Sequence, residues 1–215
     1  MVPQVLAIEV HVVSSQQDRQ RKAVRLPIHR VDDGGTQGPV EDTLAVEEPL
    51  EIRVADELVA VVMRSPGDDE RLALGFLHAE GIVRAIPDVG RVYHCGRPGD
   101  EGYGNVIDVT PGPGVSLDVD RVQASRRGTL TVSACGICGR RSIQDLAERC
   151  PPLDPGPKVT SDLLLRLCDQ LPEMQPTFRA TGGAHAAAAY TSSGDLLCCL
   201  EDVARHNAVD KVVGE

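Results

Sequence analysis

The sequence has no tryptophan and only five other aromatic residues, two phenylalanines and three tyrosines, among 215 residues. Single-stranded nucleic acid is bound by stacking bases on aromatic side chains, so this chain lacks the platform that such a protein needs. Basic residues are also few, with 22 Lys and Arg against 32 Asp and Glu and a formal charge of −10. Because nucleic-acid affinity rests on basic surface, we expect no nucleic-acid partner.

Long apolar runs are missing as well. No stretch approaches the roughly 18 residues that a membrane-spanning helix needs. Residues 1–13 lack the basic start, the long apolar run and the cleavage site of a signal peptide. The seven cysteines are then expected to be reduced thiols, because structural disulfides are rare in the cytoplasm. The expected location is cytoplasmic.

The order of the elements predicts a mixed α/β fold. Residues 14–42 are polar and interrupted by proline and glycine, which indicates a flexible N-terminal arm over 1–43. In the first helix, Ser65 is expected to be the cap and Pro66 the first residue, and Gly81 is expected to end the helix. Hydrophobic patterning predicts strands at 51–54, 58–63, 91–95, 105–110, 181–190 and 196–200, and helices at 142–149, after Thr160 or Ser161, and from Arg205 or His206 onward.

Cys135 and Cys138 lie in a glycine-rich turn that is followed directly by two arginines. Nearby cations lower the pKa of a cysteine thiol and so favour the reactive thiolate. The pair fits half of a zinc site, which His94 and Cys95 could complete, a thioredoxin-like redox pair, or a sulfur-relay pair. The motif alone leaves these three readings open.

A zinc deaminase is a sharper rival. His78-x-Glu80 followed by Cys135-x-x-Cys138 imitates the deaminase signature, in which one His and two Cys hold zinc and a Glu moves the proton. Two details oppose this reading: Ala134 replaces the expected proline, and His78 is near the end of its helix. A solvated or interfacial role suits His78 better.

A second group of residues lies near the C-terminus. Thr181-Gly182-Gly183-Ala184-His185 precedes a strand, and Arg205, His206 and Asn207 open a helix, where phosphate is commonly bound. Asp202 and Asp210 could accept hydrogen bonds from a base or sugar. Helix capping and a salt-bridged surface would explain the same residues equally well. We expect Cys168, Cys198 and Cys199 to be unreactive core thiols.

Several of these motifs, taken in order, resemble the formate dehydrogenase accessory sulfurtransferase family, FdhD. The resemblance runs from about residue 44 to residue 215. It rests on Glu47-Glu48-Pro49-Leu50-Glu51-Ile52, Ser65-Pro66-Gly67-Asp68-Asp69, Leu74-Gly75-Phe76-Leu77, Glu80-Gly81-Ile82, Cys135-Gly136-Ile137-Cys138-Gly139, Thr181-Gly182-Gly183-Ala184-His185, Glu201-Asp202 and Arg205-His206-Asn207-Ala208-Val209-Asp210-Lys211.

The resemblance implies a sulfur carrier with a cytidine-deaminase-like core. Such a protein takes persulfide sulfur from a cysteine desulfurase and passes it to the molybdenum (or tungsten) bis-guanine dinucleotide cofactor, which formate dehydrogenase requires. Cys135 would be the main persulfide carrier and Cys138 its partner, with no permanently bound metal and with a homodimer as one allowed assembly. The implied cofactor-binding residues are Gly182, Gly183, His185, Asp202, Arg205, His206, Asn207, Asp210 and Lys211.

The resemblance also implies a division of the chain and a shortened C-terminal part. Leu200 and Ala204 stand where the family often has Arg and Gly. Relatives continue beyond this sequence, so part of the sheet and pocket is expected to be missing. The expected parts are the arm at 1–43, an α/β portion at 44–125, a mobile Cys-x-x-Cys loop at 126–141 and a truncated deaminase-like core at 142–215. A zinc hydrolase and a non-catalytic cofactor-binding chaperone remain the alternatives.

Overall fold

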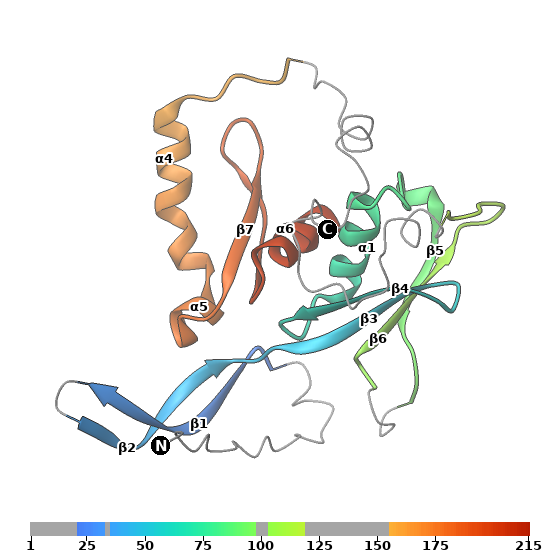
Figure 1. The fold of residues 1–215 in the computed structure, drawn as a ribbon. Helices are drawn as coiled ribbons and strands as arrows, with labels where there is room; N and C mark the ends of the chain where they lie inside the picture. The colour runs from blue at the N-terminus through green and yellow to red at the C-terminus, as the bar shows by residue number, and fades with distance from the viewer. Residues whose placement is uncertain (1–20, 33–34, 98–102, 119–154) are drawn as a thin grey trace, which may run out of the picture.

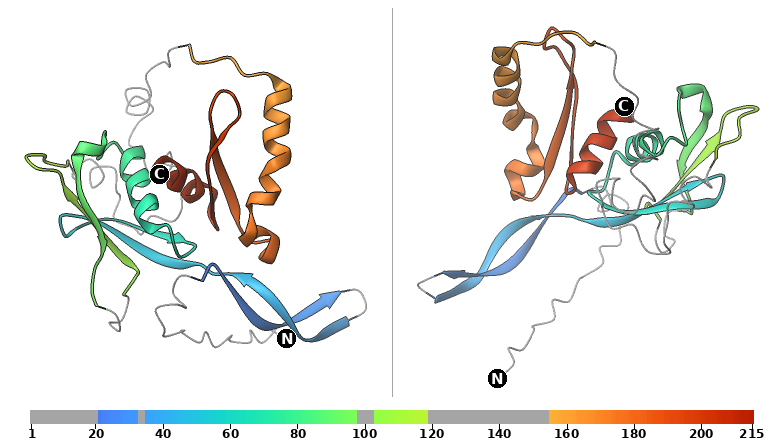
Figure 2. Two further views of the ribbon diagram at one scale, coloured as in Figure 1. Left: turned by 180° about the vertical axis from the view of Figure 1, so that it is seen from behind. Right: turned by 45° about the horizontal axis from the view of Figure 1, so that its top comes forward.

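The computed structural model describes residues 21–32, 35–97, 103–118 and 155–215. Figures 1 and 2 show the elements in a row: a mixed sheet, helix α1, helix α6, the β7–β8 hairpin and helix α4. The mixed α/β class expected from the sequence is confirmed. The finer expectation of a cytidine-deaminase-like core stays a prediction. The Cys-x-x-Cys loop and the helix expected at 142–149 lie outside the described residues.

A four-stranded sheet forms the N-terminal part of the fold. Its strands follow the order β4-β3-β6-β5, in which β3 and β6 are parallel and the other neighbours are antiparallel. Leu50, Ile52 and Val54 alternate along β3 and are buried, as the period of a half-buried strand requires. Helix α1 covers them with Leu72 and Leu77, and together these residues form the core. The bounds are β3 (Glu48–Val54), β4 (Glu57–Arg64), α1 (Asp69–Ala79), a 3₁₀ turn η2 (Ile86–Asp88), β5 (Val89–His94) and β6 (Val106–Pro111).

The start of α1 differs from the prediction. The helix begins at Asp69 and not at Pro66, because Gly67 and Asp68 both have positive φ (91° and 57°) and so cannot continue a right-handed helix. The Asp68 carboxylate is held in this conformation by Lys22 Nζ and Arg71 Nη1, each at 2.7 Å. The prediction for the end of the helix is confirmed, because Gly81 has a φ of 72° and its N–H donates to His78 O.

A β-hairpin occupies the second half of the flexible arm expected over 1–43, and residues 1–20 lie outside the described residues. Strands β1 (Ala23–Asp32) and β2 (Gly35–Ala45) pair antiparallel and project from the body, and β2 leads almost directly into β3. The prediction of a flexible arm was wrong for the residues of this hairpin. Their many polar side chains hide an alternation of apolar residues along β1. Val24, Leu26 and Ile28 share one face and stand opposite Leu44, Asp42 and Val40.

The C-terminal part packs a second hairpin between helices. It contains α4 (Ser161–Gln170), a 3₁₀ turn η3 (Leu171–Met174), α5 (Pro176–Thr181), β7 (His185–Tyr190), β8 (Leu196–Asp202) and α6 (Arg205–Val213). Thr160 caps α4 as predicted, because its Oγ1 accepts from Leu163 N at 3.2 Å. The strand expected from Thr181 starts only at His185. The reason is that Thr181 ends α5 and Gly182 follows with a left-handed φ of 67°.

Helices α1 and α6 cross at glycines. A Cβ atom at Gly75 would overlap the backbone carbonyl of Asp210, and one at Gly214 would overlap the carbonyl of Arg71. The backbones of the two helices therefore touch directly, and the antiparallel crossing puts the start of α1 against the end of α6.

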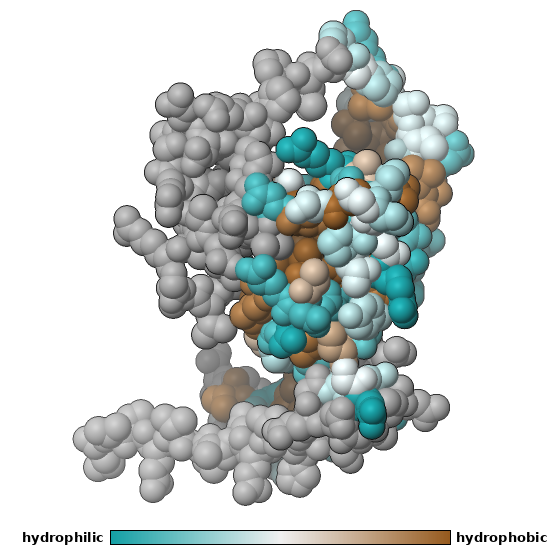
Figure 3. All heavy atoms as spheres, turned by 90° about the vertical axis from the view of Figure 1, so that its right-hand side faces the viewer, coloured by the Kyte–Doolittle hydropathy of each residue, from teal (hydrophilic) through white to brown (hydrophobic). Residues whose placement is uncertain are grey.

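None of the described helices is long and apolar enough to span a membrane. Figure 3 shows the face on the β5 side, where hydrophilic side chains lie between hydrophobic ones. On the far side of the molecule, Leu164 and Leu165 of α4 are 51% and 64% exposed. Their neighbours Leu163 and Leu167 lie against Gly194 in the β7–β8 turn, so only one side of α4 is packed.

Candidate functional site

The junction of β8 and α6 is organised by the Asp202 carboxylate, which has no exposed surface. Its Oδ1 atom accepts from Ala204 N and from Asn207 Nδ2, both at 3.0 Å. Its Oδ2 atom accepts from Ser65 N at 3.1 Å and from Lys211 Nζ at 2.8 Å. Because four donors from three segments converge on one carboxylate, the turn at 203–204 is fixed to both α6 and the β4–α1 turn.

Lys211 is also completely buried. In addition to Asp202, its ammonium group donates to Ser65 O at 3.1 Å and to Glu201 O at 3.4 Å. An ammonium has three protons, and these three acceptors match them. A buried charge is tolerated only when it is paired and hydrogen-bonded, and the Asp202–Lys211 pair meets both conditions.

Ser65 is the partner of this pair in the N-terminal part of the chain. All three of its polar groups are used, because its Oγ accepts from Val203 N at 3.1 Å while its N–H and C=O contact Asp202 and Lys211. The adjacent Met63 O accepts from Asn207 Nδ2 at 2.7 Å. From the sequence, Ser65 was expected only as a helix cap, and this role was missed.

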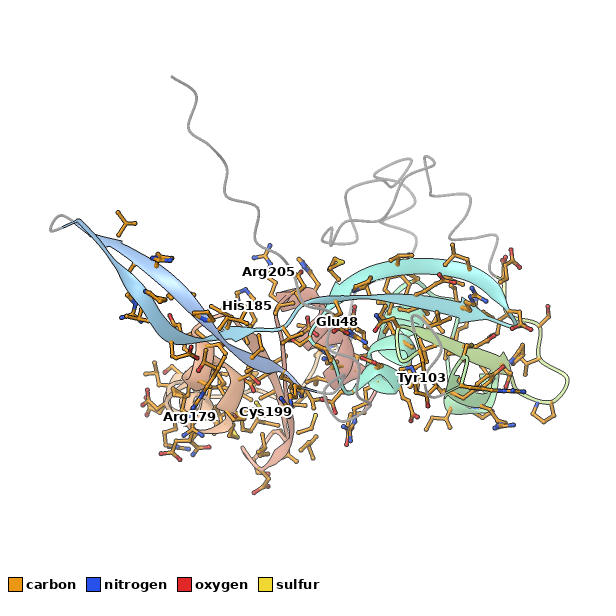
Figure 4. All side chains as sticks on the ribbon, turned by 90° about the horizontal axis from the view of Figure 1, so that it is seen from below. Glu48, Tyr103, Arg179, His185, Cys199 and Arg205 are labelled. Carbon is orange, nitrogen blue, oxygen red and sulfur yellow. The ribbon has the colours of Figure 1, made fainter. Side chains whose placement is uncertain are left out.

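Three side chains at this junction keep exposed surface and are called outward-facing here: His185 and Arg205 are exposed, and His206 is half-buried. His185 opens β7 and stands opposite Asp202 in the ladder, and Arg205 is the first residue of α6. Figure 4 shows His185 and Arg205 on the same side of the molecule, near the strand that carries Glu48. None of the three side chains has a hydrogen-bond or ion-pair partner in the described part of the chain. They therefore present uncompensated donors near the N-terminus of a helix.

The glycines beside them keep the backbone accessible. Gly182 is exposed, with open space where a Cβ would stand, and Gly183 is exposed and lies against the Ala45 side chain at the end of β2. Thr181 Oγ1 accepts from Gly183 N at 3.0 Å and orients this segment.

Asp210 lies away from these groups, at the contact between α6 and α1. Burial raises the pKa of its carboxyl to about 6, and the charge of Glu80, the residue directly after α1, adds to this effect. The structure thus places the nine predicted cofactor-binding residues between the end of α5 and the end of α6, but in different surroundings. Asp202, Asn207 and Lys211 are buried, Asp210 is half-buried, and the other five are exposed or half-exposed.

Glu201 is a further residue that the sequence analysis did not single out for a role of its own. Its buried carboxylate accepts from Thr177 N at 2.9 Å and from Phe178 N at 2.8 Å, so it caps α5 from the neighbouring strand. No local signal could have found it, because the helix and the cap are 24 residues apart.

A second polar cluster lies on the other side of the β4–α1 turn. The buried Arg64 guanidinium forms two bonds to Asp69, at 2.9 and 3.1 Å, and a third contact to Glu48 at 3.4 Å. His94 Nε2 lies 3.5 Å from Asp69 Oδ2, and its buried Nδ1 atom has no hydrogen-bond partner among the described residues. This cluster joins β3, β4, β5 and α1. Within the part of the chain described it forms no hydrogen bond or ion pair with the turn at 203–206, so its role there is structural.

The two predicted carrier residues, Cys135 and Cys138, lie outside the described residues. Of the four described cysteines, Cys168 is exposed, which corrects the expectation of a core thiol. Cys95, Cys198 and Cys199 are half-buried. Burial raises the pKa of Cys95 and Cys199, with the charges of Asp108 and Glu201 respectively adding to it. These two thiols are poor nucleophiles at neutral pH.

The residues of the zinc reading are only partly described. His78 Nδ1 lies 3.2 Å from Val83 O, which closes the end of α1. Among the residues that the structure describes, no three His, Cys, Asp or Glu side chains gather as a metal site would require. The observed contact suits a structural role for His78.

Comparisons with known proteins agree with the motifs. A family model described as the FdhD/NarQ family matches residues 45–215. A protein named "Sulfur carrier protein FdhD" from Anaeromyxobacter dehalogenans (strain 2CP-C) is 54% identical over 177 residues, 82% of this chain and 62% of that protein. A protein of the same name from Streptomyces coelicolor is 41% identical over 199 residues, which cover 90% of this chain and 69% of the relative. The chain therefore spans about 62% of the length of the Anaeromyxobacter relative.

A solved structure has a similar fold. A crystal structure from Desulfotalea psychrophila, named for a formate dehydrogenase accessory protein, superimposes with a TM-score of 0.64. It is 21% identical and the match covers 90% of this chain and 67% of that one.

Proposed function

The chain belongs to the FdhD/NarQ family, and from this premise we propose that it is a sulfur carrier that serves formate dehydrogenase. The observation that carries the proposal is the 54% identity to a protein named as a sulfur carrier. The Cys135-Gly-Ile-Cys138-Gly motif is intact in the sequence, and it supplies two thiols of the kind that sulfur transfer needs.

The transfer starts with a thiolate at Cys135. This thiolate attacks the outer sulfur of a persulfide on a cysteine desulfurase, the S–S bond of that persulfide breaks, and the desulfurase leaves as a thiolate. Cys135 then carries the sulfur as its own persulfide. No net oxidation occurs in this step, because one S–S bond replaces another.

Delivery uses the second thiol. The Cys138 thiolate attacks the Cys135 sulfur and forms a Cys135–Cys138 disulfide, while the terminal sulfur departs as sulfide to the metal of the cofactor. The molybdenum or tungsten bis-guanine dinucleotide is the substrate here. A cellular dithiol reductant then restores the two thiols, which balances the two electrons that left with sulfide.

The outward-facing residues at the β8–α6 junction bind this substrate. A dinucleotide presents diphosphate groups, and unpaired Arg and His side chains at a helix N-terminus suit such an anion. We assign the direct contacts to His185, Arg205 and His206, with Gly182 and Gly183 allowing close approach. Asp202, Asn207 and Lys211 have their polar atoms engaged within the protein and are not assigned a contact. A cytoplasmic location and a homodimer belong to the same proposal.

A persulfide assay tests the carrier role. The full chain is incubated with a cysteine desulfurase and cysteine, and intact-mass spectrometry looks for the addition of one sulfur atom. Cys135→Ala should abolish the adduct and Cys138→Ala should retain it. Cys168→Ala is the matched control, because Cys168 is the exposed thiol of the described residues and should not be needed. Equal labelling of Cys135→Ala and the parent would refute the carrier assignment.

A further inference from the structure

The Asp202–Lys211 pair does more than stabilise the fold. Replacing a buried ion pair with neutral side chains of similar volume is often harmless to stability, so burial alone gives no reason for such a pair. The fixed, directional contacts of the pair do give a reason for its presence. Each Asp202 oxygen accepts one backbone N–H and one side-chain donor, and these contacts lie at 2.8 to 3.1 Å.

These contacts define the path of the backbone just before the outward-facing residues. Val203 N is held by Ser65 Oγ and Ala204 N by Asp202 Oδ1, so both residues of the turn are anchored on the inner side. Asn207, one turn into α6, is anchored to Asp202 and to Met63 O. Arg205 and His206 lie between these anchors and are themselves free of partners in the described part of the chain.

We propose that Asp202 and Lys211 are positioning residues that aim Arg205 and His206 at the phosphates of the guanine dinucleotide. Lys211 holds Asp202, Asp202 holds the turn and Asn207, and Ser65 provides the fixed surface against which the turn is set. The inference rests on the proposed function, in which Arg205 and His206 contact that substrate.

The test variant is the double substitution Asp202→Asn and Lys211→Met. It removes both charges together, so no unpaired charge stays buried and the net charge of the protein is unchanged. An amide at position 202 presents a donor toward either Ser65 N or Ala204 N, which are themselves donors, and one side of the turn is released. A change in anion affinity then reports a change in the geometry of the turn and not a change in the long-range electrostatic field of the protein.

The matched control is Arg64→Met with Asp69→Asn. This pair is also buried and flanks the same β4–α1 turn, but its other contacts go to Glu48, His94, Gly104 and Asn105 and not to the turn at 203–206. A general loosening of the protein would affect the two double variants alike.

The measurements are the dissociation constant of GDP, by titration calorimetry on the full chain, and the cooperativity of thermal unfolding. GDP is used because it carries the guanine and diphosphate of the substrate. Asp202→Asn/Lys211→Met should weaken GDP binding about tenfold while still unfolding cooperatively, as loss of outer partners of a binding site commonly does. Arg64→Met/Asp69→Asn should bind GDP like the parent.

Ser65→Ala provides a milder second variant should the double substitution fail to fold. It removes only the acceptor of Val203 N, and it should weaken GDP binding while the fold is kept. Parent-like GDP affinity in a folded Asp202→Asn/Lys211→Met or Ser65→Ala variant, with weakened binding in Arg205→Ala, overturns the positioning role alone. Absence of GDP binding by the parent overturns the substrate site itself and this inference with it.

Discussion

Gly75 of α1 lies directly against the backbone carbonyl of Asp210 in α6, with no room for a Cβ atom between the two helices. Contacts of this kind transmit the position of one helix to the other without any flexible side chain. They make the α1–α6 crossing a rigid support for the β8–α6 junction.

Gly75→Ala should therefore destabilise the protein. Helix propensity favours alanine by roughly 1 kcal/mol, but overpacking against a backbone atom outweighs it, and the net loss should be about 2 kcal/mol. Chemical denaturation followed by circular dichroism measures the change. Gly156→Ala is the control, because a Cβ there meets nothing within 4 Å, and it should alter stability by less than about 0.5 kcal/mol.

Asp210 makes stability depend on pH in an identifiable direction. The folded state keeps the Asp210 proton up to about pH 6, whereas an unperturbed aspartate releases it near 3.8. The folded state binds more protons between these values, so this group lowers the free energy of unfolding as pH rises through that range.

Asp210→Asn should remove this slope and raise the free energy of unfolding at pH 7 by roughly 1 kcal/mol, a value reduced for the solvent that still reaches the group. Unfolding of the parent and the variant is compared from pH 4 to pH 8. Parallel curves for the two proteins would show that Asp210 has no raised pKa.

Glu201→Gln should weaken the attachment of α5. The carboxylate accepts two backbone N–H groups, and an amide can replace only one of them, which costs about 1 to 2 kcal/mol. Hydrogen exchange of the Thr177 and Phe178 amides should accelerate in the variant. Glu173→Gln, an exposed residue of the neighbouring 3₁₀ turn, serves as the control and should leave these amides unchanged.

The described cysteines should differ in reactivity. Iodoacetamide at neutral pH should modify Cys168 at least about tenfold faster than Cys95 or Cys199, whose thiols are half-buried and have raised pKa values. Peptide mass spectrometry over time gives the rates. The difference should vanish in concentrated guanidinium chloride, and its persistence there would exclude burial as the cause.

Local patterns predicted much of the fold. The alternation in β3, the apolar run in β4 and the Thr160 cap of α4 each depend on a few neighbouring residues, and all three are confirmed. The start of α1 was misplaced because Asp68 has a positive φ, and one of the two cations that hold its carboxylate, Lys22, lies 46 residues away. The β1–β2 hairpin was missed because its apolar face contains few residues. About half of these residues belong to each strand, so neither strand shows a clear pattern by itself.

The sequence indicated where the candidate site lies in the chain, but not which of its side chains are buried and which are exposed. The motif around residues 201–211 marked the region of the β8–α6 junction, yet all its charged residues looked equally available. Which of them turn inward is decided by Ser65, more than 130 positions earlier in the chain. Contacts between residues so far apart cannot be predicted from local sequence patterns. The buried Asp202 and Lys211 could therefore not be distinguished from Arg205 and His206.

The contacts of Ser65 also bear on how the protein is made. They join residues 137 and 146 positions apart, so the β4–α1 turn leaves the ribosome long before its partners in β8 and α6. Contacts of such long range slow folding, because a large loop must close before they form. The N–H, C=O and Oγ groups of Ser65 gain their partners in β8, α6 and the turn between them only after α6 has been synthesised, so we expect the β8–α6 junction to be the last part of the described fold to form.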